Sequence, residues 1–212
     1  MRMILRTILA GLSLVAAVPL LVQADFPKPA VYPASWELKF EHASPKRISV
    51  SIPGEANPKA YWYITFTVTN PTEQTNKSVE IKEQQFLPVF EMVTNNGQIV
   101  RSDQSIPNEV FNAIKNREKM ALLEPLNKVS GTIRLGSDQA RDSVAIFPEV
   151  ERRMGKFNIF IQGLSGEFTT VKSLDKDTIL RKTLQLNYFI RGDDVYPGED
   201  TVNDEPSAWI MR

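Results

Sequence analysis

Strict alternation of apolar and polar residues is the dominant pattern along this chain. It is clearest at residues 61–69, where Trp62, Ile64, Phe66 and Val68 alternate with tyrosine and threonine. Successive side chains of a β-strand point to opposite faces, so a period of two predicts a strand with two different faces. We therefore predict that these four residues form the inward row of a central strand, and that the tyrosine and threonine row faces solvent or a partner.

The same period recurs in short segments along the rest of the chain, with turn residues between them. The dipeptide at Asn96 and Gly97 is a strong signal for a tight hairpin between the strand that ends near Val93 and the next strand. The further predicted strands cover residues 36–41, 47–52, 78–82, 86–93, 98–100, 128–134, 143–147, 157–161, 179–190 and 208–211.

One segment departs from the strand pattern and predicts a short helix at residues 107–119. Val110, Phe111 and Ile114 fall on one helical face, a proline stands near the first turn, and Ser105 precedes it as a possible cap. We expect this helix to pack over an end of the sheets.

Many short strands and one helix predict an all-β fold: an antiparallel immunoglobulin-like β-sandwich with one short inserted helix. The proline-rich residues 25–35 predict an extended N-terminal arm. Residues 36–212 then form a single sandwich domain with a C-terminal strand extension.

The first 24 residues predict a secretory signal peptide. They combine two arginines, an apolar run at residues 8–22 and a small-residue site that ends at Ala24. A membrane span needs about 20 apolar residues, so this run is short for an anchor, although an uncleaved anchor is the alternative. We predict cleavage after Ala24 and no transmembrane span in the mature protein.

Charge and cysteine content bear on the partners and the location. Removing 2 arginines from 25 basic residues, against 25 acidic residues, leaves the mature chain with a net charge of −2. This balance argues against a nucleic-acid partner, which calls for a basic patch. The chain has no cysteine, so its fold uses no disulfide, which is more typical of a bacterial envelope protein than of a small animal extracellular domain. We expect an exported protein, periplasmic or secreted.

The residues of common catalytic and metal sites are scarce. The single histidine, His42, ends a predicted strand without a signature context, and "GLSGE" has Glu167 where a nucleophile elbow needs glycine. Zinc and iron sites draw on cysteine and histidine, so neither is expected. We predict that the protein is not an enzyme and holds no cofactor or metal, with a hydrolase of unrecognised type as an alternative.

An acidic stretch at residues 193–205 offers the oxygen ligands that calcium prefers. Its spacing matches no known calcium loop, so we favour a solvated loop and leave calcium binding open. Its carboxylates are Asp193, Asp194, Glu199, Asp200, Asp204 and Glu205.

Tyr61 and Tyr63 are the candidate ligand face. They stand two residues apart on one strand face, so both rings could line a flat surface for a sugar or peptide. Aromatic side chains also pack beside β-branched neighbours in ordinary sheets, and we favour that structural role.

Four segments resemble a known group of proteins: "WYITFTVTNPTEQ", "FLPVFEMVTNNGQIVRS", "KVSGTIRLGSDQARDSVAIFP" and "FNIFIQGLSGE". Their order over residues 36–192 resembles exported bacterial proteins of unknown function with a telokin-like, immunoglobulin-like β-sandwich. In this chain the charged glycine-containing element is spread over residues 136–142. The resemblance implies a fold and a location, and it implies no catalytic residues.

The complete β-pattern predicts a non-enzymatic exported protein that binds or scaffolds another cell-envelope component. An edge strand or the tyrosine and threonine face would make the contact, with a cell-envelope protein or a polysaccharide as the partner. The alternative is a carbohydrate-binding module that uses Tyr61 and Tyr63.

Overall fold

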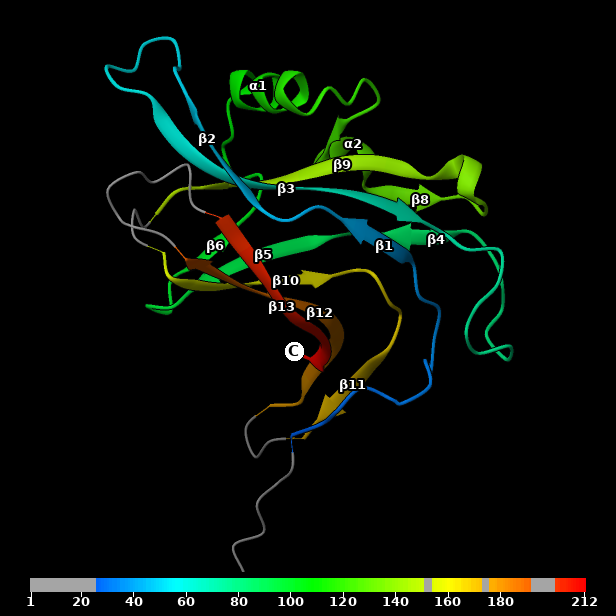
Figure 1. The fold of residues 1–212 in the computed structure, drawn as a ribbon. Helices are drawn as coiled ribbons and strands as arrows, with labels where there is room; N and C mark the ends of the chain where they lie inside the picture. Colours follow the sequence, from blue (N-terminus) through cyan, green and yellow to red (C-terminus); the bar gives the residue numbers. More distant parts are fainter. Residues whose placement is uncertain (1–25, 151–153, 173–175, 192–200) are drawn as a thin grey trace, which may run out of the picture.

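The computed structural model describes residues 26–150, 154–172, 176–191 and 201–212. It confirms a mostly antiparallel, all-β fold with little helix. In Figure 1, a helix lies over one sheet, and that sheet lies over a second sheet. The predicted signal peptide at residues 1–24 lies outside the described residues.

The long strand β3 (Lys59–Thr69) is the centre of a five-stranded sheet. Strand β9 (Arg141–Pro148) runs antiparallel along one side of β3. Two shorter strands share the other side, because β2 pairs with the first half of β3 and β1 with the second half. The remaining strands of this sheet are β1 (Lys39–His42), β2 (Lys46–Val50) and β7 (Glu124–Pro125), which runs parallel to β9.

The second sheet has six strands and is organised around β12 (Thr178–Arg191). Strand β10 pairs with residues 184–189 of β12, β13 pairs with its other side, and β11 pairs with its first four residues. The other five strands of this sheet are β5 (Val89–Thr94), β6 (Ile99–Arg101), β10 (Lys156–Gln162), β11 (Phe168–Val171) and β13 (Thr201–Met211). A separate two-stranded sheet pairs β4 (Gln84–Phe86) with β8 (Gly131–Ile133).

The predicted inward row of β3 is confirmed. Trp62, Ile64, Phe66 and Val68 are at most 6% exposed and pack into the core between the two sheets. The Phe66 ring stacks on the Phe90 ring of the second sheet, with 5.1 Å between the centroids. Burying a side chain of this size contributes about 1.5–3 kcal/mol, so this row is a main source of stability.

The predicted hairpin at Asn96 and Gly97 is also confirmed. It joins β5 to β6, and the Gly97 N–H donates to the Thr94 carbonyl at 2.9 Å. Gly97 has a φ of 78°, a backbone conformation that glycine adopts without steric cost.

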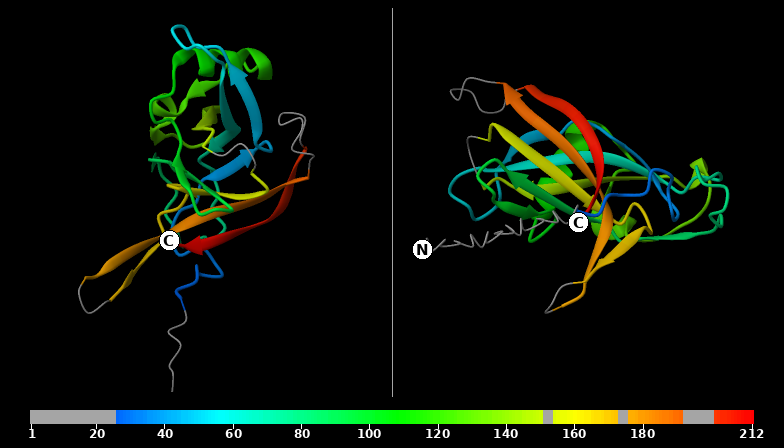
Figure 2. Two further views of the ribbon diagram at one scale, coloured as in Figure 1. Left: turned by 90° about the vertical axis from the view of Figure 1, so that its left-hand side faces the viewer. Right: turned by 90° about the horizontal axis from the view of Figure 1, so that it is seen from below.

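The predicted helix is present as α1 (Asn108–Glu118), but its position differs from the expectation. It lies across the outer face of the first sheet and not over an end of the sheets (Figure 1, Figure 2). Pro107 occupies the cap position, and no side chain caps the helix, so the prediction of Ser105 as a cap is wrong. Two more short helices, α2 (Leu126–Val129) and the 3-10 turn at Ser137–Gln139, were not predicted. Among the described residues, no helix is both long and apolar enough to cross a membrane.

Three predicted strands differ from the structure for local reasons. Residues 78–82 form no strand, because the Asn76 side chain accepts the Ser78 N–H at 3.0 Å and begins a turn. The strand predicted at 86–93 is divided between β4 and β5, with a proline at position 88. The strand predicted at 128–134 is divided between α2 and the short β8.

Candidate functional site

Tyr61 and Tyr63 lie beneath helix α1, and their side chains are 5% and 1% exposed. The expectation that this row faces solvent or a partner is therefore wrong, and the two rings form no exposed surface on which a sugar or peptide could stack. They belong to a second apolar cluster on the outer face of the first sheet, which we call the helix-covered face. Its other buried members are Val50, Val110, Ile114, Leu123, Val144 and Ile146.

The helix-covered face also contains a polar contact between the sheet and the end of α1. The Tyr63 hydroxyl donates to Glu118 Oε1 at 2.5 Å, and Lys46 Nζ lies 2.7 Å from Glu118 Oε2. Burial raises the pKa of Glu118, but the hydrogen bonds from Lys46 and Tyr63 outweigh burial and hold that pKa below its usual value. Burial and the same hydrogen bond raise the pKa of the Tyr63 hydroxyl. Tyr63 therefore has a structural role.

The other sequence-based candidates are not gathered into a site among the described residues. His42 ends β1 in an exposed position, with its Nδ1 atom 3.1 Å from the Ala43 carbonyl. Of the acidic stretch, Asp204 and Glu205 belong to β13, and residues 193–200 lie outside the described part. Within the described ranges, no group of three acidic or histidine side chains could hold a metal ion.

Exposed apolar side chains occur at the opposite end of the molecule from α1. We define the arm–hairpin end as residues 26–36 with the β11–β12 hairpin, residues 168–172 and 176–181 (Figure 1, Figure 2). Phe168 is 60% exposed and Ile179 is 56% exposed. The register pairs Thr170 with Ile179, so Ile179 and Phe168 lie on the same face of the hairpin. In the arm, the exposed apolar side chains are Phe26, Val31 and Tyr32.

The arm is held against the chain that enters β11. The Ala30 N–H donates to Glu167 Oε1 at 2.7 Å, and the Gly166 N–H donates to the Trp36 carbonyl at 3.1 Å. The approach at Gly166 is so close that a Cβ atom there would lie 2.5 Å from Trp36 Nε1. The arm is therefore packed against the sandwich at this point.

A buried ionic cluster lies beneath this end. Lys182 of β12 is 3% exposed, and its Nζ atom lies 2.5 Å from Glu37 Oε1 and 3.1 Å from Glu167 Oε2. Burial lowers the pKa of Lys182, but the two carboxylates outweigh burial and raise it. The ammonium also lies 5.1 Å from the centre of the Trp209 ring. Because Lys182 stays charged, its role is to hold the arm, β12 and β13 together, and it is a poor nucleophile.

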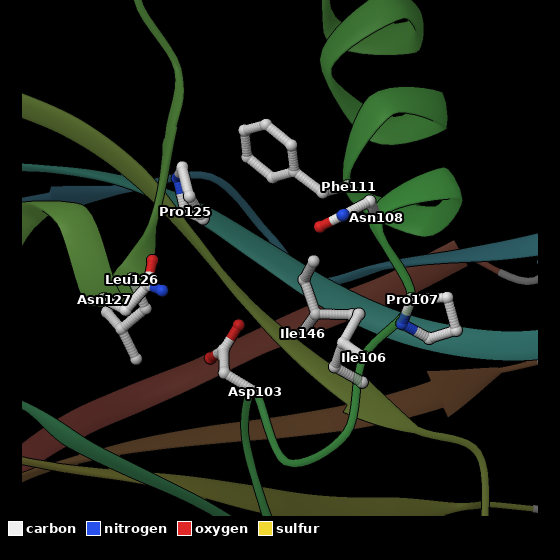
Figure 3. Close-up of a pocket in the computed structure, with 9 residues that line it drawn as sticks. All are labelled: Asp103, Ile106, Pro107, Asn108, Phe111, Pro125, Leu126, Asn127 and Ile146. Atoms are coloured by element: carbon white, nitrogen blue, oxygen red, sulfur yellow. The ribbon is translucent and has the colours of Figure 1, made fainter.

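A pocket of about 180 Å³ opens beside the N-terminal end of α1 (Figure 3). Asn108 and Asn127 are exposed and mark its rim. Its apolar lining is provided by α1, β9 and the segments that enter α1 and α2, namely Ile106, Pro107, Phe111, Pro125, Leu126 and Ile146.

The carboxylate of Asp103 points into this pocket from below (Figure 3). Its Oδ2 atom is buried and has no hydrogen-bond partner. Burial raises the pKa of this carboxyl to about 6, although the Ser102 side chain and the Ile146 backbone lower it by hydrogen bonding. A buried carboxylate without a cationic partner is costly, and such groups are common at functional sites.

Sequence reasoning missed both the arm–hairpin end and Asp103. The run Phe168-Thr-Thr-Val has strong β-propensity and could have indicated β11. No local signal identifies Asp103, because it is buried by packing against β9 and α2, which are distant from it in sequence.

Comparisons of the chain with protein-family models, with curated proteins and with solved structures each found no match.

Proposed function

We propose that this protein is a non-enzymatic, exported binding protein that contacts a cell-envelope protein through its arm–hairpin end. The supporting observation is the pair of exposed apolar side chains, Phe168 and Ile179, on one face of the projecting hairpin. Exposed apolar side chains that gather in one place often mark interaction sites. The tyrosine face, which was the other candidate surface, is buried.

The pairing of the hairpin supports a role in partner binding. Residues 178–181 of β12 pair with β11, whereas the ladder with β10 begins only at Leu184. An isolated two-stranded hairpin is marginally stable in water, and a third strand or a covering surface stabilises it. A partner that adds a strand to β11 would supply backbone hydrogen bonds and cover the exposed apolar face.

The chemistry of this end favours a protein partner over a polysaccharide. Stacking on sugar rings needs exposed aromatic faces. Phe26 and Tyr32 are exposed on the arm, but the hairpin face presents one phenylalanine beside an isoleucine. Aromatic side chains next to aliphatic ones are typical of the apolar centre of protein interfaces.

Export is the second part of the proposal and has its own test. Cleavage after Ala24 would give a mature N-terminus of Asp25, Phe26 and Pro27. Mass spectrometry of the protein from cells that produce it should detect this N-terminus. An intact Met1 in the envelope fraction would contradict cleavage, and protein confined to the cytoplasm would contradict export.

Partner binding can be tested by photo-crosslinking in intact cells. A photoreactive phenylalanine analogue would replace Phe168 in one variant and Leu122 in the control. Leu122 is 80% exposed and lies in the segment between α1 and β7, so it matches Phe168 in being exposed but not in location.

We expect position 168 to give one discrete crosslinked species that position 122 does not give. Mass spectrometry then identifies the partner, and a product of twice the chain mass would indicate a second copy instead of another protein. The same products from both positions, or none from position 168, would contradict the proposal.

A further inference from the structure

A second candidate site lies at the pocket beside α1, away from the arm–hairpin end. We propose that this pocket binds a small organic ammonium ion, with the Asp103 carboxylate as the counter-ion and the apolar lining around the body of the ligand. This inference does not depend on the proposed partner protein, because the pocket and the arm–hairpin end share no residue.

The backbone around Asp103 holds the carboxylate in an unusual position. Asp103 and Ser105 have φ angles of 58° and 56°, in the left-handed region that side chains other than glycine rarely adopt. The Asp103 N–H donates to the Ile146 carbonyl at 2.8 Å, which fixes the turn to β9. Aspartate adopts this region more readily than most residues, and such conformations cluster at active sites and ligand-binding segments.

The charge of the ligand follows from what the carboxylate lacks. Among the described residues, no lysine or arginine forms an ion pair with Asp103, so no positive charge of the protein compensates the carboxylate. An ammonium group brings a positive charge and several N–H donors, which a buried carboxylate needs. The ring of Phe111 adds an aromatic wall that suits the same charge.

The size of the ligand follows from the volume of the pocket. An apolar cavity of about 150 Å³ accommodates benzene, so a pocket of about 180 Å³ suits one ring or a short branched chain with an ammonium group. Benzylamine fits this description, and benzyl alcohol is its neutral counterpart of nearly the same shape.

The charged groups around the pocket allow a clean pH test. Among the described residues that line the pocket, Asp103 is the sole titratable one. On α1, the Nζ atom of Lys115 lies 6.0 Å from the Phe111 ring centre and donates to the Leu123 carbonyl. Because burial raises the Asp103 pKa to about 6, the carboxylate is mostly ionised at pH 8 and mostly neutral at pH 5. Binding of an ammonium ion should weaken as the pH falls between these values.

The experiment is an NMR titration of the purified protein with benzylamine, with benzyl alcohol as the control ligand. The matched variant is Asp103→Asn, which keeps the shape of the side chain, removes the charge and tolerates the left-handed backbone. We expect benzylamine to shift the Ile146 methyl signals at pH 8, and to bind at least about tenfold more weakly to the variant. Benzyl alcohol should bind both proteins equally weakly.

Four results would overturn the proposal: no shift at Ile146 with millimolar benzylamine, equal affinities of the two proteins for benzylamine, shifts confined to another surface, or equal affinity at pH 5 and pH 8. Circular dichroism of Asp103→Asn at both pH values checks that the variant is folded, so that weaker binding can be attributed to the lost charge.

Discussion

The helix-covered face and the arm–hairpin end both contain aromatic side chains on β-strands, but they differ in what covers them. On the helix-covered face, α1 covers Tyr61 and Tyr63, so that both side chains are almost fully buried. At the arm–hairpin end, the hairpin projects from the sandwich and leaves Phe168 and Ile179 exposed. The alternating pattern predicted an exposed tyrosine row, which is buried in the structure, and it gave no sign of the exposed apolar side chains at the arm–hairpin end.

The two regions also differ in how they are held. The helix-covered face depends on apolar packing and on the Tyr63 hydrogen bond to Glu118. The arm–hairpin end is anchored by the buried cluster of Lys182 with two glutamates. Burial beneath a helix indicates a structural role for Tyr61 and Tyr63, and the Lys182 cluster fixes the arm to the sheet beneath the exposed side chains of the hairpin.

The largest expected effect is at the anchor of the arm–hairpin end. Lys182→Met should lower the free energy of unfolding by about 3–5 kcal/mol, because it leaves the buried Glu167 and the partly buried Glu37 without their counter-charge. Urea unfolding at pH 7 measures this loss. As a control, Lys39→Met removes a lysine of an exposed ion pair and should cost less than about 1 kcal/mol. Equal losses in the two variants would show that the cluster is not buried in solution.

A loss of similar size is expected on the helix-covered face. Tyr63→Ala removes a ring that is 1% exposed and should cost about 3–5 kcal/mol, as for other buried aromatic side chains. The same urea experiment measures it. A loss below about 1 kcal/mol would mean that α1 does not cover this face in solution.

Removing only the Tyr63 hydroxyl should give a smaller and pH-dependent effect. Tyr63→Phe should cost about 1.5–3 kcal/mol at pH 7, since the hydrogen bond is made to a charged carboxylate. The pKa of Glu118 is lowered in the folded protein, so its contribution is present at neutral pH and is lost as the pH falls through that pKa. The difference between wild type and variant should therefore shrink in acid. A difference that does not change between pH 7 and pH 3 would contradict the hydrogen bond.

Sequence patterns predicted the inward row of β3 and the hairpin at Gly97 because both depend on local spacing alone. They predicted the wrong exposure for the tyrosine row, because alternation separates two faces without saying whether a helix covers the second, but the structural role favoured for Tyr61 and Tyr63 agrees with their burial. The continuous apolar run at residues 144–147 of β9 was the available clue, since such a run indicates a strand buried on both faces. The pocket could not be predicted, because the burial of Asp103 depends on segments that are distant in sequence.

The smallest stability change is expected at the exposed hairpin. Phe168→Ser with Ile179→Ser should alter the free energy of unfolding by less than about 1 kcal/mol in total, because both side chains are more than half exposed. Urea unfolding again provides the measurement. A loss above about 2 kcal/mol would mean that the isolated protein already covers these side chains.

The most direct test of the account compares envelope association of that double variant with association of Leu122→Ser, a control in the segment between α1 and β7. Both proteins should unfold at the wild-type urea concentration, and co-sedimentation with the native envelope fraction should fall at least about tenfold for the hairpin variant alone. Unchanged association of the folded hairpin variant, or an equal loss in the Leu122 control, would contradict the assignment of the binding surface to the arm–hairpin end.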